Sequence, residues 1–167
     1  MDRAAAVWNF PVVGREKGRL IRRLLARHRP VSAIEIGSLI GYSAILIAGN
    51  LPPRGRLVCV EANDYLADVV RLNVEAAGLG KRVSVKNGDA IRVIPFLRSR
   101  FDFAFLDAAK EEYLDYLRQI EPRLRRGAVV VADNTGPAFG RDVKSYLAYV
   151  RTSGRYESRE QDRKSVV

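Results

Sequence analysis

Five short apolar runs, separated by longer segments with helical periodicity, constrain the fold of this chain most strongly. Continuous apolar runs are typical of strands that are buried on both faces, and helical crossovers between such strands make the sheet parallel. The sequence therefore predicts a doubly wound α/β fold. The predicted strands are Val31–Ile36, Leu57–Val60, Val83–Val85, Phe101–Leu106 and Ala128–Ala132.

Apolar residues at helical spacing predict the helices between these strands. One helix begins after Asn63, with Gly78 and Gly80 available to end it, and another is expected over Glu111–Leu124. Near the start of the chain, a stripe of Leu and Ile lies among arginines and ends before Pro30, which predicts a basic amphipathic helix. The predicted apolar faces are Leu66, Val69, Val70 and Val74; Tyr113, Leu117, Ile120 and Leu124; and Leu20, Ile21, Leu24 and Leu25.

The length of 167 residues, 47% of them apolar, suits one domain with a continuous core and is too short for two. We expect an N-terminal arm and the basic helix within residues 1–30, and the α/β core over 31–167. No apolar run is long enough to span a bilayer, and the first thirty residues lack a signal-peptide pattern. The single cysteine, Cys59, lies in an apolar run that favours a buried thiol. These features predict a cytoplasmic protein.

The positive charge is concentrated at the front of the chain. Residues 1–30 hold eight Lys and Arg against two acids, which is six of the ten excess charges. Such a segment is typical of a solvated helix face, and it is also what a binding surface for RNA or another anion needs. His28 lies in the last turn of the basic helix, where its side chain favourably faces the helix dipole.

A glycine-bearing turn follows the first predicted strand, in the segment from Glu35 to Ser43. Ligands of open α/β sheets bind at such strand ends. Gly37 allows the backbone to approach a ligand, and Gly41 allows a tight start to the next helix. The spacing Glu-x-Gly-x-x-x-Gly differs from the fingerprint of dinucleotide folds and disfavours a nicotinamide cofactor. Two glycines here could also serve the turn alone.

Two further strand ends carry polar residues suited to a nucleoside. Glu61 ends the second strand, where doubly wound nucleotide folds place an acid that accepts hydrogen bonds from ribose hydroxyls. Gly88-Asp89-Ala90 follows the third strand, so Asp89 could reach an adenine amine or simply cap the next helix. Together with the glycine turn, these residues predict an adenosine-binding strip.

The fourth and fifth strands end in oxygen-bearing side chains. Asp107 follows the fourth strand, and Asp133 and Asn134 follow the fifth. Oxygen ligands suit Mg²⁺, although each acid could instead cap a helix. Lys110 lies three residues beyond Asp107 and is the candidate general base, because a neighbouring metal cation would lower the pKa of its ammonium.

From about Val12 to Glu160 the chain resembles the metal-dependent O-methyltransferases of the catechol and caffeoyl-CoA type. The resemblance rests on Val12–Gly18, on Glu35–Ser43, and above all on the combination of Asp107, Lys110, Asp133 and Asn134. It implies a Rossmann-like, seven-stranded methyltransferase fold, with a shortened N-terminal helical region and a shortened last strand. It also implies that S-adenosylmethionine and Mg²⁺ are cofactors, and that a small aromatic molecule with vicinal hydroxyls is the acceptor.

The same resemblance assigns roles to residues. Asp107, Asp133 and Asn134 would hold Mg²⁺, and Lys110 would activate the acceptor hydroxyl. Glu160 is a candidate for the acid that grips the second hydroxyl. The residues implied in cofactor binding are Val13, Glu35, Gly37, Ser38, Gly41, Tyr42, Ser43, Glu61, Ala62, Gly88, Asp89, Ala90 and Asp107.

Two rival functions stay open at this level. The basic helix would suit an RNA-modifying methyltransferase, but Leu106-Asp107-Ala108-Ala109 stands where base N-methyltransferases commonly carry an Asn/Asp-Pro-Pro-aromatic turn. A non-catalytic adenosine-binding module would keep Glu35, Gly37 and Glu61 without needing Lys110. The apolar residues Val7, Trp8 and Phe10 of the N-terminal arm favour a homodimer.

Overall fold

A parallel sheet of five strands forms the centre of the protein in the computed structural model, which describes residues 14–136 and 139–160. The strands are β1 (Ser32–Ile36), β2 (Arg56–Glu61), β3 (Val83–Asn87), β4 (Phe101–Leu106) and β5 (Leu124–Ala132). Their order across the sheet is β3-β2-β1-β4-β5, and every neighbouring pair is parallel. All five predicted strands are confirmed, with bounds that move by a few residues at most.

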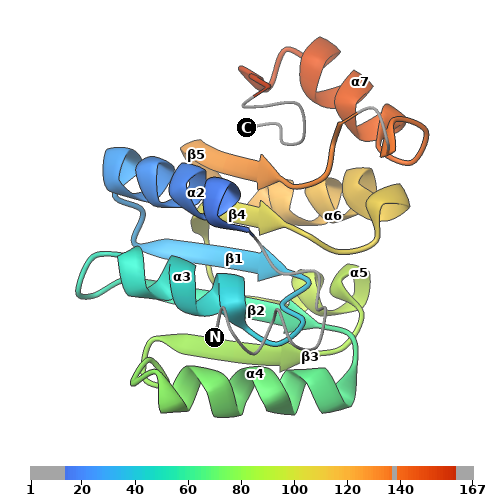
Figure 1. Ribbon diagram of the computed structural model, residues 1–167. Helices are drawn as coiled ribbons and strands as arrows, with labels where there is room; N and C mark the ends of the chain where they lie inside the picture. The colour runs from blue at the N-terminus through green and yellow to red at the C-terminus, as the bar shows by residue number, and fades with distance from the viewer. Residues whose placement is uncertain (1–13, 137–138, 161–167) are drawn as a thin grey trace.

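Helices cover both faces of the sheet, so the domain has three layers (Figure 1). On one face lie α2 (Arg15–His28), α3 (Tyr42–Asn50) and α4 (Asp64–Ala76). On the other face lie α5 (Ala90–Val93), α6 (Tyr113–Ile120) and α7 (Lys144–Thr152). Short 3-10 turns, η1 (Ile94–Phe96), η2 (Lys110–Glu112) and η3 (Glu121–Arg123), flank α5 and α6.

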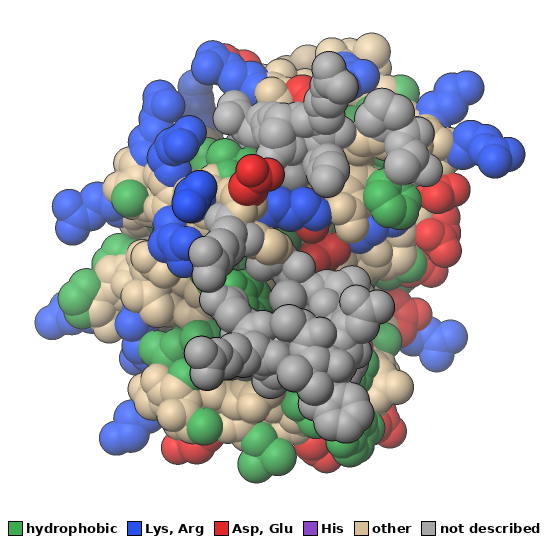
Figure 2. Space-filling model, viewed as in Figure 1, with side chains coloured by type: hydrophobic (Ala, Val, Ile, Leu, Met, Phe, Trp, Pro, Cys, Tyr) green, Lys and Arg blue, Asp and Glu red, His purple; other side chains and the backbone are tan. Residues whose placement is uncertain are grey.

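Alternate residues of each strand supply the two halves of the core. In β4, Phe103 and Phe105 pack in the layer of α2, α3 and α4, while Ala104 and Leu106 pack in the layer of α5, α6 and α7. The basic helix α2 buries Ile21 and Leu25, each 1% exposed, and such burial stabilises by about 1.5–3 kcal/mol per side chain. Arg19, Arg22, Arg23 and Arg27 of this helix are exposed, and Figure 2 shows basic side chains gathered where α2 lies.

The strand order creates a switch point between β1 and β4. The chain leaves β1 towards α3 on one face, and it leaves β4 towards α6 on the other. In such sheets the diverging loops open a crevice at the carboxyl ends of the strands. The predicted residues Gly37, Asp107 and Asp133 all follow strands at this edge.

The structure corrects one expectation. Leu124 does not continue the apolar face of the helix after Lys110: α6 ends at Ile120, η3 contains Pro122, and Leu124 begins β5. Proline lacks the N–H that a continuing helix needs, which explains the break. The doubly wound, Rossmann-like fold class is confirmed, and residues 14–136 and 139–160 form five parallel strands of it.

The expectations for Cys59 and His28 are confirmed. Cys59 is buried and in no disulfide, and burial raises the pKa of its thiol well above the usual range. His28 lies in the last turn of α2. No helix in the described part of the chain is long and apolar enough to cross a membrane. Val7, Trp8, Phe10 and the predicted cofactor contact Val13 lie outside the described residues.

Candidate active site

The turn after β1 lies directly against the end of β4. Gly37 has a φ of +83°, and a Cβ atom added there would lie 2.3 Å from the carbonyl oxygen of Asp107. Neither the backbone conformation nor the space therefore allows a side chain. Gly41, with a φ of +84°, lies at the start of α3 against Val70 of α4. Both predicted glycines thus shape the turn that a cofactor would have to approach.

Glu61 organises this turn from the neighbouring strand. Its Oε2 accepts hydrogen bonds from the backbone N–H groups of Ser38 (3.0 Å) and Leu39 (2.9 Å), and its Oε1 accepts one from Asn63 (3.1 Å). The side chain is buried. Hydrogen bonding to the ribose was the predicted role, and the structure adds a second: Glu61 holds the turn after β1 in place.

Glu35 is a buried carboxyl group, and only one of its two oxygens accepts hydrogen bonds from the described residues. Its Oε2 accepts hydrogen bonds from Ser38 Oγ (2.7 Å) and Cys59 Sγ (3.3 Å), whereas Oε1 has no hydrogen-bond partner among the described residues. Burial raises the pKa of Glu35 to about 7, against the lowering effect of Ser43, Ser38 and Cys59. A buried oxygen without a donor is costly, and a ligand that brings an N–H or O–H group would remove that cost.

Asp89, which follows the third strand, has a structural role in the fold. Asp89 accepts a hydrogen bond from the N–H of Ile91 (2.9 Å) and so caps α5, while Ala90 is buried as its first residue. The helix-cap interpretation of Asp89 is therefore confirmed. A cavity of about 520 Å³ beside it is lined by Gly88, Asp89 and the aliphatic and aromatic groups of Val93, Phe96 and Leu97. A flat, partly polar ring could bind there.

Asp107 and Lys110 form an ion pair at the end of β4. Lys110 Nζ lies 2.9 Å from Asp107 Oδ1 and 2.8 Å from the hydroxyl oxygen of Tyr113. Burial raises the pKa of Asp107, and Asp133 raises it further, while Lys110 and Lys17 lower it. The carboxylates that follow β4 and β5 therefore interact electrostatically.

The hydroxyl of Tyr113 connects Lys110 to the ends of β4 and β5. Its side chain is fully buried, and its hydroxyl lies 3.0 Å from the carbonyl oxygens of both Leu106 and Asp133. Because a hydroxyl can donate one hydrogen and accept others, Tyr113 can accept from Lys110 while it donates to either strand end. The spacing of Tyr113 in an apolar helix face predicted only burial, so sequence reasoning missed this residue.

Asp133 and Asn134 converge on one cationic group, the ammonium of Lys17 in α2. Lys17 Nζ lies 2.6 Å and 2.7 Å from the two carboxylate oxygens of Asp133, and 2.7 Å from Asn134 Oδ1. Asn134 has a φ of +53°, and its N–H donates to Asp133 Oδ1 (2.8 Å). This left-handed turn directs both side chains to the same point, and asparagine tolerates it better than most residues.

The donor set fits a divalent metal such as Mg²⁺. In the described part of the chain no three His, Cys, Asp or Glu side chains cluster as a metal site. The candidate site instead combines the carboxylates of Asp107 and Asp133 with the amide oxygen of Asn134. Lys17 acts as a stand-in ion, because a cation already lies where the oxygens of Asp133 and Asn134 meet. Hard oxygen donors that leave positions for water or substrate suit Mg²⁺.

The turn after β1 and the polar residues after β4 and β5 line one cleft. A cavity of about 320 Å³ is lined by residues of the turn after β1 and by the polar residues after β4 and β5. Those that the sequence predicted are Gly37, Ser38, Tyr42, Ser43, Asp107, Lys110 and Asn134. The structure thus brings together the predicted cofactor turn and the predicted reacting residues.

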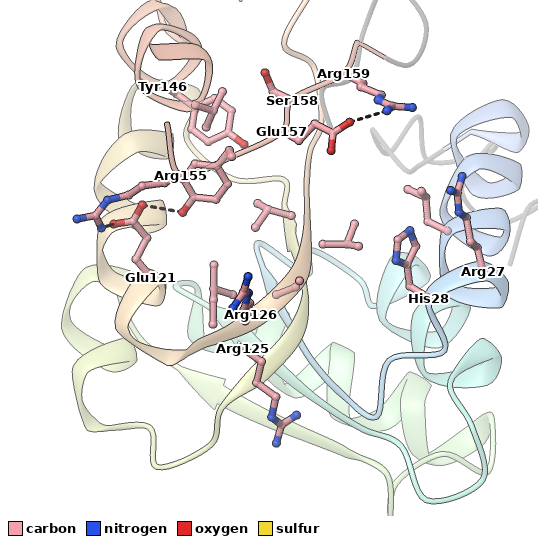
Figure 3. Close-up of a pocket in the computed structure, with 18 residues that line it drawn as sticks. Arg27, His28, Glu121, Arg125, Arg126, Tyr146, Arg155, Glu157, Ser158 and Arg159 are labelled. Atoms are coloured by element: carbon pink, nitrogen blue, oxygen red, sulfur yellow. Dashed lines mark hydrogen bonds and ion pairs between the residues drawn. The ribbon is translucent and has the colours of Figure 1, made fainter. Parts of the chain in front are cut away.

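Some predicted residues lie elsewhere. Ala62 is exposed at the start of the loop after β2. The Oε2 atom of Glu160 lies 3.9 Å from a guanidinium nitrogen of Arg151 in α7, and its side chain is half exposed. Glu160 does not line this cleft. A larger cavity of about 570 Å³ lies beside β5, between the end of α2 and the chain after α7 (Figure 3). Its lining contains none of the predicted cofactor, metal or catalytic residues.

The fold and the site together define a doubly wound α/β domain with a glycine turn and an acidic, lysine-bearing edge, and comparison with known proteins identifies its family. The sequence profile of the O-methyltransferase family matches residues 3–141. The chain is 36% identical over 152 residues to a catechol O-methyltransferase from Sus scrofa, which covers 87% of this chain and 80% of that protein. It belongs to the S-adenosylmethionine-dependent O-methyltransferase family, so the resemblance seen in the sequence is confirmed.

Two further relatives agree. A catechol O-methyltransferase from Mycobacterium tuberculosis is 37% identical over 123 residues, 73% of this chain and 56% of that protein. The crystal structure of an O-methyltransferase from Bacillus cereus in complex with SAH superposes with a TM-score of 0.88 at 26% identity, over 98% of this chain and 86% of that one. Of several curated catechol O-methyltransferases that it matches, the chain spans only 55–57% of the length.

Proposed function

We propose that this chain transfers a methyl group from S-adenosylmethionine to a hydroxyl oxygen of a small acceptor, with a divalent cation such as Mg²⁺ at the carboxyl edge of the sheet. The observation that supports this most is the convergence of Asp133 and Asn134 oxygens on one cationic nitrogen, beside the Asp107–Lys110 pair. The relatives named as catechol O-methyltransferases support the same activity.

In this proposal, the residues around the turn after β1 bind the methyl donor. Gly37 leaves the backbone accessible, and Glu61 keeps the turn in one conformation. The unpartnered Oε1 of Glu35 would accept a hydrogen bond from the donor's polar groups. Asp89 and the cavity beside it would contact the adenine ring.

Binding of the metal falls to Asp107, Asp133 and Asn134. When bound, S-adenosylmethionine supplies an electrophilic methyl group, and a divalent cation lowers the pKa of a hydroxyl beside it. Two carboxylates and one amide leave several positions open on a cation that prefers six ligands. Two neighbouring oxygens of a catechol-like acceptor would fill two of them, and this supports the vicinal hydroxyls proposed for the acceptor.

Lys110 accepts the hydroxyl proton in this proposal. An amine takes a proton through its lone pair and becomes an ammonium with three N–H donors. Asp107 Oδ1 and Tyr113 Oη already lie 2.9 Å and 2.8 Å from Nζ, so two acceptors for that ammonium are in place. Holding the reacting oxygen next to the methyl donor then contributes through proximity.

The acceptor class is tested by comparing catechol, phenol, 2-methoxyphenol and a structured RNA as acceptors of a labelled methyl group. We expect transfer to catechol, and at least about 100-fold less to phenol and 2-methoxyphenol, because neither offers two ionisable neighbouring oxygens. Equal rates on catechol and phenol would contradict the vicinal requirement. Methylation of the RNA alone would favour the rival function, an RNA-modifying methyltransferase that binds RNA through its basic helix.

A cytoplasmic location and a homodimer stay predictions.

A further inference from the structure

Lys17 is a partly buried lysine on the basic surface helix α2. Its side chain is 22% exposed, whereas Arg19, Arg22, Arg23 and Arg27 of the same helix are exposed. It contacts Asp133, whose side chain is 4% exposed, and Asn134, which are 116 and 117 residues away in the sequence. Its position therefore links the first turn of α2 to the end of β5.

The stability of α2 does not explain this position. Lys17 is the third residue of the helix, where the partial positive charge of the helix dipole disfavours a cation. The neighbouring Gly18 lies against α3, since a Cβ there would be 3.2 Å from Leu46 Cδ1. Close contact with α3 brings the start of α2 to the carboxyl edge of the sheet and within reach of the metal ligands.

The ammonium of Lys17 uses the same oxygens that a metal would need. Three oxygens lie 2.6–2.7 Å from one nitrogen, so no second cation can occupy that position together with it. The charges lead to the same conclusion. Lys17 and Lys110 balance Asp107 and Asp133, and adding a divalent ion with both lysines in place would leave two uncompensated positive charges.

We propose that Lys17 is an internal counter-cation of the metal site: it occupies the oxygens of Asp133 and Asn134 in the metal-free protein and is displaced when a divalent ion binds. This inference rests on the proposed function, because it requires a metal at these residues. Metal binding then breaks the tie between β5 and the first turn of α2. Lys17 thus weakens metal affinity while it stabilises the metal-free fold.

The test measures metal affinity directly, by electron paramagnetic resonance of Mn²⁺ and by isothermal titration of Mg²⁺, in the wild type, Lys17→Met and Arg23→Met. Lys17→Met is expected to bind Mn²⁺ about tenfold more tightly, because no charge-assisted hydrogen bonds to Asp133 have to be broken. Arg23→Met removes one charge from the exposed face of α2, so it reports the effect of general electrostatics, which we expect to be less than about twofold.

A second measurement uses the wild type alone and keeps the inference testable if Lys17→Met folds poorly. Hydrogen exchange of the first turn of α2 is expected to become faster on adding Mg²⁺, since its tie to β5 is lost. Unchanged exchange together with equal or weaker Mn²⁺ binding in Lys17→Met would overturn the role of Lys17 while leaving the metal site intact. No metal binding by either protein would overturn the metal site and this inference together.

Discussion

The hydroxyl oxygen of Tyr113 lies 2.8 Å from Lys110 Nζ, and this contact anchors the proposed base to the ends of β4 and β5. Lys110 also pairs with Asp107, but Asp107 is a proposed metal ligand. Tyr113 is therefore the partner that positions Lys110 independently of the metal.

Tyr113→Phe removes this anchor without changing the size of the ring. We expect the methyl-transfer rate to fall about tenfold or more, with S-adenosylmethionine binding little changed, because a proton acceptor must be held within hydrogen-bonding reach. Steady-state kinetics and isothermal titration measure the two effects. Tyr149→Phe is the matched control, since it removes a hydroxyl that bonds to Glu121 away from the site. A Tyr113→Phe variant as active as Tyr149→Phe would contradict the anchoring role.

Gly37→Ala should disrupt the turn after β1 by a clash as well as by backbone strain. Its Cβ would lie 2.3 Å from the Asp107 carbonyl oxygen, so one of the two strand ends has to move. Gly78→Ala is the control: its φ is +72°, but no atom lies within 4 Å of the added Cβ. We expect about 1 kcal/mol of destabilisation in Gly78→Ala from strain alone, and clearly more in Gly37→Ala. Urea unfolding of both variants measures the free energy of unfolding. Equal losses in the two variants would show that the close contact between residue 37 and Asp107 adds nothing to the backbone strain.

Glu61→Ala should weaken S-adenosylmethionine binding by at least about tenfold. The variant loses a charge-assisted acceptor and also frees the backbone N–H groups of Ser38 and Leu39, which Glu61 now holds. Isothermal titration gives the affinity, and hydrogen exchange reports whether the turn loosens. Asp68→Ala controls for the lost charge, because Asp68 lies on α4 and pairs only at the surface with Arg71. Unchanged affinity in Glu61→Ala would remove this residue from the cofactor site.

Glu35 should make the ligand-free protein less stable as the pH rises. Its folded-state pKa is raised to about 7 from 4.5, so the protonated form is favoured in the fold. Relative to the unfolded chain, this stabilisation is fully present below about pH 4.5 and is lost as the pH rises through about 7, by up to about 3 kcal/mol. Glu35→Gln keeps the shape and removes the titration. Urea unfolding from pH 5 to 8 should show a fall in stability with pH in the wild type that is clearly smaller in Glu35→Gln, and parallel curves would contradict the raised pKa of Glu35.

The strands and the placement of the site could be predicted from the sequence because buried parallel strands read as continuous apolar runs. The residues directly after such strands must then meet at one edge, which is why Gly37, Asp107, Asp133 and Asn134 lie together. The helix after Lys110 was predicted too long, since Leu124 fits the helical spacing while Pro122 ends the helix before it.

Lys17 and Tyr113 could not be found in this way. Lys17 lies among arginines in an amphipathic helix, and its position four residues before Ile21 puts it on the apolar face, but the sequence does not show that it contacts Asp133. Tyr113 fits a buried apolar face, and the sequence does not show that its hydroxyl reaches Lys110. Contacts between distant segments depend on how closely the layers pack, which the spacing of residues does not encode.

Metal dependence of methyl transfer tests the central claim most directly. The measurement is the rate of labelled methyl transfer from S-adenosylmethionine to catechol, first in excess chelator, then after Mg²⁺ is added back, for the wild type, Lys110→Met and Lys81→Met. We predict no turnover in chelator, full recovery with Mg²⁺, a loss of about 10²–10⁴ in Lys110→Met, and a wild-type rate in Lys81→Met, where the lysine is exposed before β3. Full activity in chelator, or a wild-type rate in Lys110→Met, would contradict it.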